Sequence, residues 1–563
     1  MLHIPRGLAA VLAVALAASI AGIGNAFAYD DIHLIELNTR FHSLANWREI
    51  LTSPYWPPPY NQEHYRPLTS LLFTAQYELG GGGPLAFRIT SYALYAGCAA
   101  AFLSLAARLL PPGIALAVAL LFAAHPVHVE AVAPAVGQSE LLVALAALVM
   151  AVRYLDRRKG NGLTGRDWGL LGALYLAASL SKEHGLLIPA LLLALEALLI
   201  RGGTVRQRAS TLWRGYAFLG ALTVGLVSLR VALLGGEFSR QWTAEVFDGL
   251  SMGGRALTML GVVPEWARLM LWPAHLQADY APQEIVAATS LGLKQAAGVL
   301  LLLSAGTAWW LARRRAPAIS LGVLWMAVTL FPASNVLIPT GSVLAERLLF
   351  LPSAGFLLAL GGLTALLIVE PKPSPSRKKG AWAVCLLLVL GGVGRSVERH
   401  RVWRNEAFFS VRGVQDAPLS YRMNRGYAEI LFELDRWDLA MAAYDRALEL
   451  APPTHVWRVR NDLARRLRAE GRSDIEVDQL SLSLEQNPDQ EDTRGYLIIA
   501  FLALGRYSDA AAQADSALAR HGDNTVFREL RALADSAAGS DAPPGTVRVG
   551  IRTGPVSGLR PAP

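Results

Sequence analysis

The sequence predicts an all-α protein in which a multi-span membrane helix bundle precedes a solenoid of paired helices. The first observation is that 53% of the 563 residues are hydrophobic and only 17% are charged, and the apolar residues form long runs such as 186–200 and 381–393. The second is that the sequence after residue 394 becomes charged and repeats with a period of about 35 residues. These features exclude a wholly soluble protein and a disordered one.

The charges and the cysteines exclude further classes. The net charge is +8, but Lys and Arg cluster at the ends of apolar runs, so no nucleic-acid partner is expected. Both cysteines, Cys98 and Cys385, lie inside apolar runs. A disulfide framework and a cysteine-based metal cluster are therefore excluded.

The apolar runs predict about eleven membrane spans, several of which must borrow flanking residues to cross a bilayer. The first run ends in Ala26-Phe27-Ala28, so it could be either a cleaved secretory signal or an uncleaved anchor. The expected spans are 7–27, 85–109, 113–124, 141–154, 168–180, 185–200, 216–234, 293–311, 318–331, 350–368 and 381–393.

Basic residues predict the orientation of these spans. They cluster in four loops, around Arg157, Arg206, Arg314 and Lys378, and all four loops fall on one side if the spans alternate. The positive-inside rule makes that side cytoplasmic, and an odd number of spans then places the C-terminal region outside. Because a crossing at 256–272 would break this pattern, that segment is interpreted as a helix on the outer face.

The region after residue 394 contains a repeat. Asp435, Gly471 and Gly505 mark equivalent turns, 36 and 34 residues apart, and each is followed by Arg. This period is typical of tetratricopeptide repeats, in which small residues let two helices pack closely. The second unit departs from the pattern, with Glu476 and Ser483 where alanines are usual. We expect a membrane domain at 1–394, repeats at 395–540 and a disordered tail at 541–563.

The first outer loop, 29–84, carries candidate chemistry. Asp30 and Asp31 directly follow the first span, where they could be solvated end charges or supply a general base. Arg66 ends the loop, where a guanidinium could hold a phosphate. Aromatic residues between them could form an interfacial belt or a platform for a sugar or lipid; they are Tyr55, Trp56, Tyr60 and Tyr65.

Other polar residues also lie at predicted outer ends. His125, His128 and Glu130 could suggest a metal site, but their spacing matches no usual zinc pattern. Lys182 could pair with Glu183 or meet an anionic group. The remaining candidates are Glu140, Asp279, Glu346 and Arg347. Acids and cations on one face suit a reaction on a lipid phosphate.

The order of these motifs resembles that of the transmembrane and tetratricopeptide-repeat O-mannosyltransferases, which belong to the C-type membrane glycosyltransferases. Each motif alone is weak, but six occur in the right order, and the resemblance covers nearly the whole chain. The motifs are Asp30-Asp31, YRPLT at 65–69, HPVHVEAV at 125–132, SKEHG at 181–185, PASN at 332–335 and AERLLFLPS at 345–353.

The resemblance implies transfer of a sugar, with mannose as the first candidate, from a polyprenyl-phosphate donor to a hydroxyl acceptor outside the cytoplasm. It places Asp30 as the base, Asp31 as its acidic neighbour and His33 as the accompanying histidine. It sets Lys182, with Glu183, near the donor phosphate, and it places Glu346 and Arg347 in the family's Ala-Glu-Arg motif. The acceptor would be a protein or a glycan, and no metal is required, although the resemblance leaves room for a divalent ion.

The sequence departs from the family pattern at two places. Gln138 stands where the family has arginine, and Glu140 is one carbon longer than the usual aspartate. Ser91 and Tyr95 replace a usual asparagine and histidine. These departures bear on donor recognition more than on the base.

Two other functional classes remain open at this point. One is a transporter or flippase of a lipid-linked sugar, which would place ionisable residues near the bilayer midplane. The other is a membrane-anchored repeat scaffold without activity. In each case the protein is expected in a membrane, either a bacterial inner membrane with outward repeats or an endoplasmic reticulum membrane with lumenal repeats.

Overall fold

The computed structural model describes residues 4–58, 60, 63–200, 204–235, 243–280, 283–367, 375–522 and 524–539. These residues form helices and connecting turns, with no strand among them, which confirms the all-α class. The chain divides into two compact units, Met1–Ala417 and Pro418–Pro563. The tail expected at 541–563 lies outside the described residues.

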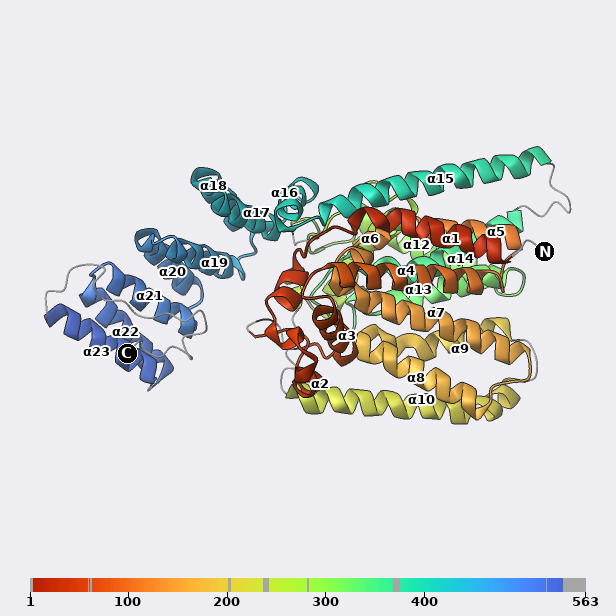
Figure 1. The fold of residues 1–563 in the computed structure, drawn as a ribbon, viewed down its shortest axis with the longest axis horizontal. Helices are drawn as coiled ribbons and strands as arrows, with labels where there is room; N and C mark the ends of the chain where they lie inside the picture. The colour runs from red at the N-terminus through yellow and green to blue at the C-terminus, as the bar shows by residue number, and fades with distance from the viewer. Residues whose placement is uncertain are drawn as a thin grey trace. The chain divides into compact units, whose positions relative to one another are not determined.

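The first unit is a bundle in which every expected span coincides with a helix (Figure 1). Pro112 and Pro317 stand in the first turns of their helices, where their missing N–H groups cost nothing. The helices are α1 (Ile4–Ser19), α4 (Leu85–Ala106), α5 (Pro112–Ala123), α7 (Gln138–Lys159), α8 (Gly165–Ser181), α9 (Ile188–Leu199), α10 (Val205–Leu234), α12 (Leu293–Ala312), α13 (Pro317–Leu330), α14 (Phe350–Leu367) and α15 (Pro375–Val402).

Not every one of these helices is long enough to cross a bilayer alone. Six are long and apolar enough, and a bent pair, Pro112–Ala123 with Pro126–Val132, makes seven if it counts as one span. Helices Arg6–Gly22 and Pro317–Leu330 are apolar but shorter. The expected number of crossings, about eleven, therefore stays a prediction.

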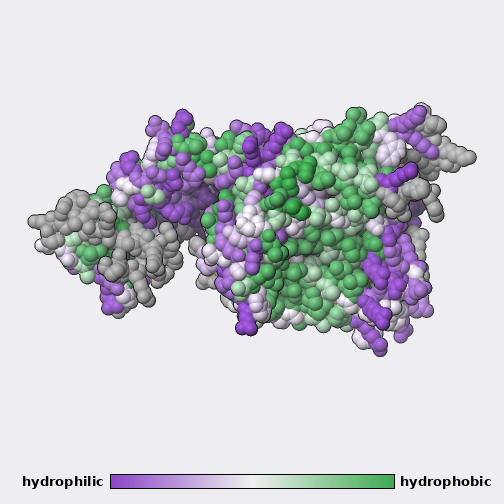
Figure 2. Space-filling view, viewed as in Figure 1, coloured by the Kyte–Doolittle hydropathy of each residue, from purple (hydrophilic) through white to green (hydrophobic). Residues whose placement is uncertain are grey.

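The outside of the bundle is apolar, as a lipid-facing surface must be. Leucines at 300–303 of α12 and at 386–388 of α15 are exposed, although each belongs to a long apolar helix. Figure 2 shows a broad hydrophobic band over the first unit with hydrophilic residues at both of its ends. In water such a band would be an aggregation surface, so it indicates contact with hydrocarbon.

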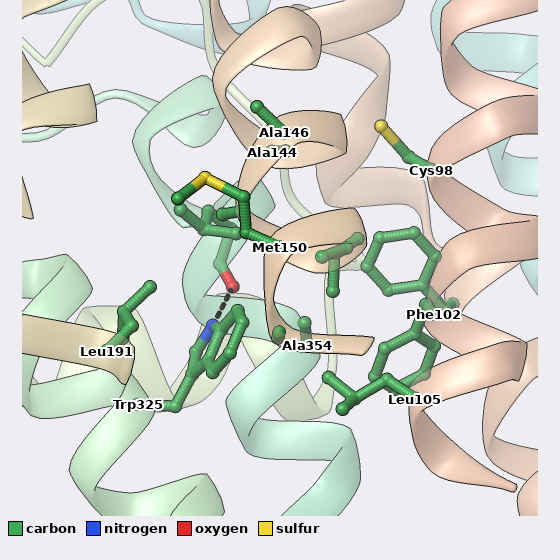
Figure 3. Packing of buried hydrophobic residues seen from close by; sticks show 14 of the residues in the cluster. Cys98, Phe102, Leu105, Ala144, Ala146, Met150, Leu191, Trp325 and Ala354 are labelled. Carbon is green, nitrogen blue, oxygen red and sulfur yellow. Dashed lines mark hydrogen bonds between the residues drawn. The ribbon is translucent and has the colours of Figure 1, made fainter. Parts of the chain in front are cut away.

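Glycines allow close approach between neighbouring helices inside the bundle. A Cβ on Gly322 of α13 would lie 2.3 Å from the carbonyl oxygen of Gly355 on α14. Trp325 follows one turn later and donates its indole N–H to the carbonyl of Leu351 at 3.0 Å. Figure 3 shows this hydrogen bond within the packed core, close to Ala354. Small residues at helix contacts are the main packing device in membranes.

One end of the bundle carries the basic residues. Asp167 caps the start of α8 and pairs with Arg153 and Arg157 from the end of α7. Glu196 of α9 pairs with Arg158 in the same region. These ion pairs fix the ends of three helices against one another, while the surplus of arginine remains at this end.

The first outer loop folds over the other end of the bundle (Figure 1). It contains a π-helical turn, η2 (Ile32–Glu36), and the short helices η3 (Thr39–His42), η4 (Leu44–Asn46) and α2 (Trp47–Thr52), and α3 (Pro67–Leu79) follows it. The buried rings of Phe41, Phe73 and Phe87 form an apolar core under this loop. The loop is thus a packed cap on α3 and α4.

The segment expected to lie on the outer face forms α11 (Met252–Leu271), which packs against α12. Gly298 of α12 permits the contact, because a Cβ there would lie 1.9 Å from the carbonyl oxygen of Leu260. All residues of α11 are described, and this helix is not among those that are long and apolar enough to cross. Its position relative to the membrane stays a prediction.

The second unit is a stack of helix pairs, as the repeat predicted. Asp435, Gly471 and Gly505 each have a positive φ, between 55° and 72°, at the turn within a pair. The following arginines donate their backbone N–H groups to carbonyls five residues earlier. The pairs are α17 (Tyr421–Glu433) with α18 (Trp437–Leu450), α19 (Val456–Ala469) with α20 (Ser473–Gln486), and α21 (Glu491–Ala503) with α22 (Tyr507–His521), and α23 (Thr525–Gly539) packs on the last pair.

The structure explains why the second repeat tolerates polar residues at small-residue positions. Glu476 is buried, and its carboxylate pairs with Arg468 from the facing helix. Ser483 is buried too, and its hydroxyl donates to the carbonyl of Trp457 at 3.2 Å. Each of these two side chains therefore has a polar partner, which offsets part of its desolvation.

The contact between α13 and α14 yields a stability prediction. Gly322→Ala forces the added methyl group against the backbone of α14, so we expect a loss of roughly 1–3 kcal/mol of stability. Thermal unfolding of the purified protein in detergent measures this loss. Gly306→Ala on α12 is the matched control, because nothing lies within 4 Å of its Cβ position. Equal melting temperatures for the two variants would contradict the packing described here.

Candidate functional site

Polar residues predicted at the outer ends of the spans gather at the end of the first unit that carries the first outer loop. They are brought there by short elements between the long helices. These elements are η5 (Pro126–His128) and α6 (Val129–Val132) after α5, η6 (Ala135–Gly137) before α7, η7 (Glu183–Leu187) after α8, and η11 (Glu346–Leu349) before α14. Segments far apart in the sequence thereby line one region.

Asp31 is a structural carboxylate at this end. Its side chain is fully buried, and it accepts the backbone N–H groups of Ala135 and Val136 at 2.8 and 3.0 Å. It also lies 3.5 Å from a guanidinium nitrogen of Arg88, which is equally buried on α4. Burial raises the pKa of Asp31, while Arg88 and the two N–H groups oppose that rise.

Arg88 was not among the residues predicted from the sequence, yet it ties three segments together. Its guanidinium donates to the carbonyls of Asn25 and Ala26, at 3.4 and 2.6 Å, and to the carbonyl of Ala133. The chain that leads from α1 to Asp31 is thereby fixed to α4 and to the second outer loop. Arginine within an apolar helix was the only sequence signal for this role.

Asp30 differs from Asp31 in its exposure to solvent and in its hydrogen bonding. It is partly exposed, and none of the described residues donates a hydrogen bond to its carboxylate. Burial raises its pKa to about 6, and the nearby Arg347 opposes this rise. The carboxylates of Asp31, Glu130 and Glu406 raise the pKa further. A carboxylate with this pKa is half-ionised near pH 6 and mostly ionised at neutral pH, so it is suited to accept a proton.

The turn that presents Asp30 is held by α16 (Glu406–Asp416). Tyr29 has a φ of 56°, which is unusual for a residue with a side chain. Its backbone N–H donates to the carboxylate of Glu406 at 2.6 Å, and its ring lies 4.8 Å from that of Phe409. Sequence reasoning placed this segment with the repeats, whereas the contacts place it beside Asp30.

Arg347 is the cation whose charge lowers the pKa of Asp30. Its backbone N–H and its guanidinium both donate to Glu130, which is buried in α6. The side chain of Arg347 remains 28% exposed. Part of the guanidinium is therefore available to a ligand while Glu130 fixes its position.

Two more cations are held by carboxylates in the same way. Lys182 forms an ion pair with Glu140 of α7, whose other oxygen lies 3.2 Å from Nε2 of His184. Because of burial, the pKa values of Lys182 and His184 are lowered. The Lys182–Glu183 pair considered from the sequence is replaced in the structure by Lys182–Glu140.

Glu183 instead pairs with Arg66 from the end of the first outer loop. The contact is bidentate, with Nε of Arg66 3.1 Å from both oxygens and Nη2 2.8 Å from one of them. Burial alone would raise the pKa of Glu183, but Arg66 and His64 hold it well below its usual range. The guanidinium also lies over the ring of Tyr55, 4.8 Å from its centroid.

The three cations form one electrostatic group. The positive charges of Arg66 and Arg347 both lower the pKa of Lys182, and the negative charge of Glu140 attracts both arginines. Each cation has a fixed carboxylate partner, so the group is organised before any ligand binds. Such preorganised charge can stabilise an anion that develops during a reaction.

Several predicted residues have structural roles instead. The His125 ring is bonded to the carbonyl of Met270, and the His128 ring to the hydroxyls of Tyr95 and Ser353. Within the described ranges, no three His, Cys, Asp or Glu side chains are placed to hold a metal ion.

Glu346 and Asp279 are buried near η11. Glu346 accepts the backbone N–H of Gln277 and the hydroxyl of Tyr280, and lies 3.9 Å from Arg399 of α15. Arg399 was not predicted from the sequence. The hydrogen bonds from Gln277 and Tyr280 fix Glu346 and with it η11, on which Arg347 stands, while Arg399 supplies a nearby positive charge.

Gln138 occupies the position where the family pattern has arginine. It is buried between helices, exchanges amide hydrogen bonds of 2.9 Å with Gln76, and donates to Ser91 at 3.2 Å. A neutral amide thus joins α3, α4 and α7, and the positive charge of the site comes from other residues.

Comparison with known proteins identifies relatives among the protein O-mannosyl-transferases. The chain is 26% identical over 409 residues to protein O-mannosyl-transferase TMTC3 of Homo sapiens, a match that covers 68% of this chain and 44% of the relative. It is 25% identical over 523 residues to Tmtc3 of Drosophila melanogaster, covering 78% and 55%. It is 27% identical over 473 residues to TMTC4 of Mus musculus, covering 74% and 63%.

The chain spans about half the length of the curated relatives it matches. No protein-family model matches it. The matches confirm the resemblance found in the motifs: the chain is a distant homologue of these membrane and tetratricopeptide-repeat proteins over most of its own length.

The two neighbouring aspartates should affect stability in opposite ways. Asp31→Asn removes the charge that faces Arg88 and turns an amide donor toward a backbone N–H, so we expect a loss of about 3 kcal/mol. Asp30→Asn removes a carboxylate that none of the described residues hydrogen-bonds, and should leave the melting temperature unchanged or higher. Thermal unfolding of both variants in detergent checks this. A destabilised Asp30→Asn beside an unaffected Asp31→Asn would reverse the assigned roles.

Proposed function

We propose that this protein is a membrane glycosyltransferase that moves a sugar, with mannose as the first to test, from a polyprenyl-phosphate donor to a hydroxyl of a protein acceptor. One observation carries the proposal. Asp30 is a carboxylate without a described hydrogen bond, with a pKa of about 6, beside the partly exposed Arg347. The relationship to protein O-mannosyl-transferases supports it.

In the proposed reaction Asp30 accepts the proton of the acceptor hydroxyl as that oxygen attacks the anomeric carbon. The bond between that carbon and the phosphate oxygen breaks, and its electron pair leaves with the phosphate. A single displacement of this kind inverts the configuration at the anomeric carbon. One well-placed base is typically worth about 10²–10⁴-fold in rate.

The leaving phosphate would meet Arg347 first. Arg347 is the most exposed of the three cations, whereas Arg66 and Lys182 are nearly buried against Glu183 and Glu140. Glu130 fixes the orientation of Arg347, so the guanidinium needs little rearrangement when negative charge develops. Arg66 and Lys182 would add to the positive potential from behind.

We propose that the site faces away from the cytoplasm. Glu140 and Arg157 lie about 25 Å apart along α7 at 1.5 Å per residue, so the site and the basic end are on opposite sides of the bundle. The positive-inside rule assigns the basic end to the cytoplasm. The repeat unit would then offer an acceptor chain a second surface on the outer side.

A transporter of a lipid-linked sugar is the second candidate. It would be favoured by ionisable residues near the middle of the spans. The charged groups of this protein instead gather where the helices end, which favours chemistry at the membrane surface.

The decisive experiment is Asp30→Asn. The change keeps the volume of the side chain and removes its basicity, so transfer from a polyprenyl-phosphate sugar to an acceptor peptide should fall by at least about 100-fold. Mass spectrometry of the acceptor measures the transfer, and unchanged thermal unfolding shows that the fold is intact. Retention of most activity by this variant would place the base elsewhere.

The pKa of Asp30 predicts a pH dependence. The base must be ionised, so kcat/KM should rise with pH through about 6 and then level off. Glu406→Gln keeps an oxygen that can accept the N–H of Tyr29 but removes a negative charge that raises this pKa. The acidic limb should therefore move to lower pH, with a smaller plateau because the base is weaker. Glu36→Gln, an exposed change in the same loop, should leave the profile as it is; equal profiles for all three proteins would refute the role of Glu406.

A further inference from the structure

We propose that a pocket in the first outer loop binds the acceptor polypeptide through one of its carbonyl or carboxylate oxygens. The inference rests on the proposed function and adds the acceptor subsite to it. The pocket has a volume of about 310 Å³ and lies beside η2, the turn that follows Asp31. Its lining comes from two segments of the loop and includes His33, Asn38, Arg40, Pro57, Pro58 and Tyr60.

Two residues that line this pocket each have a buried hydrogen-bond donor with no partner among the described residues. Asn38 is 4% exposed, and its amide nitrogen is buried without a hydrogen bond. Nη2 of Arg40 is buried and unpaired too. A buried donor without an acceptor costs stability, so such donors point to a ligand that supplies one.

The two donors are held next to each other. Nε of Arg40 donates to the amide oxygen of Asn38 at 3.2 Å, and Nη1 donates to the carbonyl of Pro54 at 3.3 Å. The amide nitrogen of Asn38 and Nη2 of Arg40 therefore remain as a pair of donors. The fixed geometry selects a ligand that carries acceptor oxygens.

The shape and lining favour a polypeptide over a phosphate group. An arginine that binds phosphate usually offers two parallel N–H groups, whereas two nitrogens of Arg40 are already engaged within the loop. The lining also includes Pro57, Pro58 and Tyr60, whose side chains suit the apolar parts of a peptide. A peptide can supply an oxygen, from a main-chain carbonyl or an acidic side chain, to the two donors, and apolar groups to the prolines and the tyrosine.

A row of aromatic rings leads from the pocket to the candidate site. The hydroxyl of Tyr60 and Nδ1 of His33 are hydrogen-bonded at 2.9 Å. The ring of Tyr60 lies 5.8 Å from that of Trp56, which lies 6.1 Å from that of Tyr55. Tyr55 carries Arg66 over its face and lies close enough to Asp30 to feel its charge. Tyr55 is buried in the core under the loop, so packed rings connect the pocket wall at Tyr60 to the residues around Asp30.

Asn38→Asp tests the pocket without emptying it. The new carboxylate keeps the acceptor for Nε of Arg40 and replaces the N–H donors with a second oxygen, and its negative charge is paired with that guanidinium, so the loop should stay folded. We would measure binding of short fluorescent peptides with a single threonine, flanked by Glu in one set and by Gln in the other, by anisotropy. The full-length protein would carry Asp30→Asn, so that binding is measured without transfer.

We expect Kd to rise about 10-fold for Asn38→Asp, the effect of one or two lost hydrogen bonds. Arg40→Gln should act in the same direction, while Arg48→Gln, an exposed arginine of α2 outside the pocket, should change nothing. Equal losses for both peptide sets indicate a main-chain carbonyl, and a loss confined to the Glu set indicates a carboxylate. Unchanged Kd values, or no binding of either set to the parent protein, would overturn the pocket assignment. Neither result depends on whether Asp30 is the base, which the transfer assay decides separately.

Discussion

The contact between Arg88 and Asp31 is the constraint on which the candidate site depends. A fully buried ion pair is costly to desolvate, and it is tolerated here because each partner has further hydrogen bonds. Those bonds go to the chain after α1, to the second outer loop and to the start of α7. Removing this pair would free the turn that presents Asp30, so the position of the proposed base depends on Arg88, a residue to which no catalytic role is assigned.

The three cations around the site are also held by carboxylates from other segments of the chain. Arg347, Lys182 and Arg66 are paired with Glu130, Glu140 and Glu183, which come from different elements of the bundle. Each pair fixes a side chain and joins two elements at once. Each carboxylate also neutralises part of the positive charge of its partner. The cation whose side chain is most exposed, Arg347, is therefore the one that a ligand can contact most directly.

The sequence predicted the helices and the repeats, but it did not predict which charged residues pair with one another. Long apolar runs and the repeated turns at Asp435, Gly471 and Gly505 predicted the helices and the paired stack, because hydrophobicity and left-handed turns are local properties. The partners of charged residues are not local. Glu140 was expected as a lone acid but binds Lys182, 42 residues later. Arg88 stands out only as a charge within an apolar helix, and nothing in the local sequence shows that its partner is Asp31.

The contact between α16 and Tyr29 shows why the boundary of the catalytic unit could not be drawn from composition. Charged helical sequence begins after residue 394, yet Glu406 accepts the N–H of Tyr29 and Phe409 packs on its ring. Tyr29 needs such support, because its positive φ costs energy that neighbouring contacts must offset. The strained residue stands directly before Asp30. The segment after the last apolar helix therefore helps to orient Asp30, the proposed base, and the charge of Glu406 raises the pKa of its carboxylate.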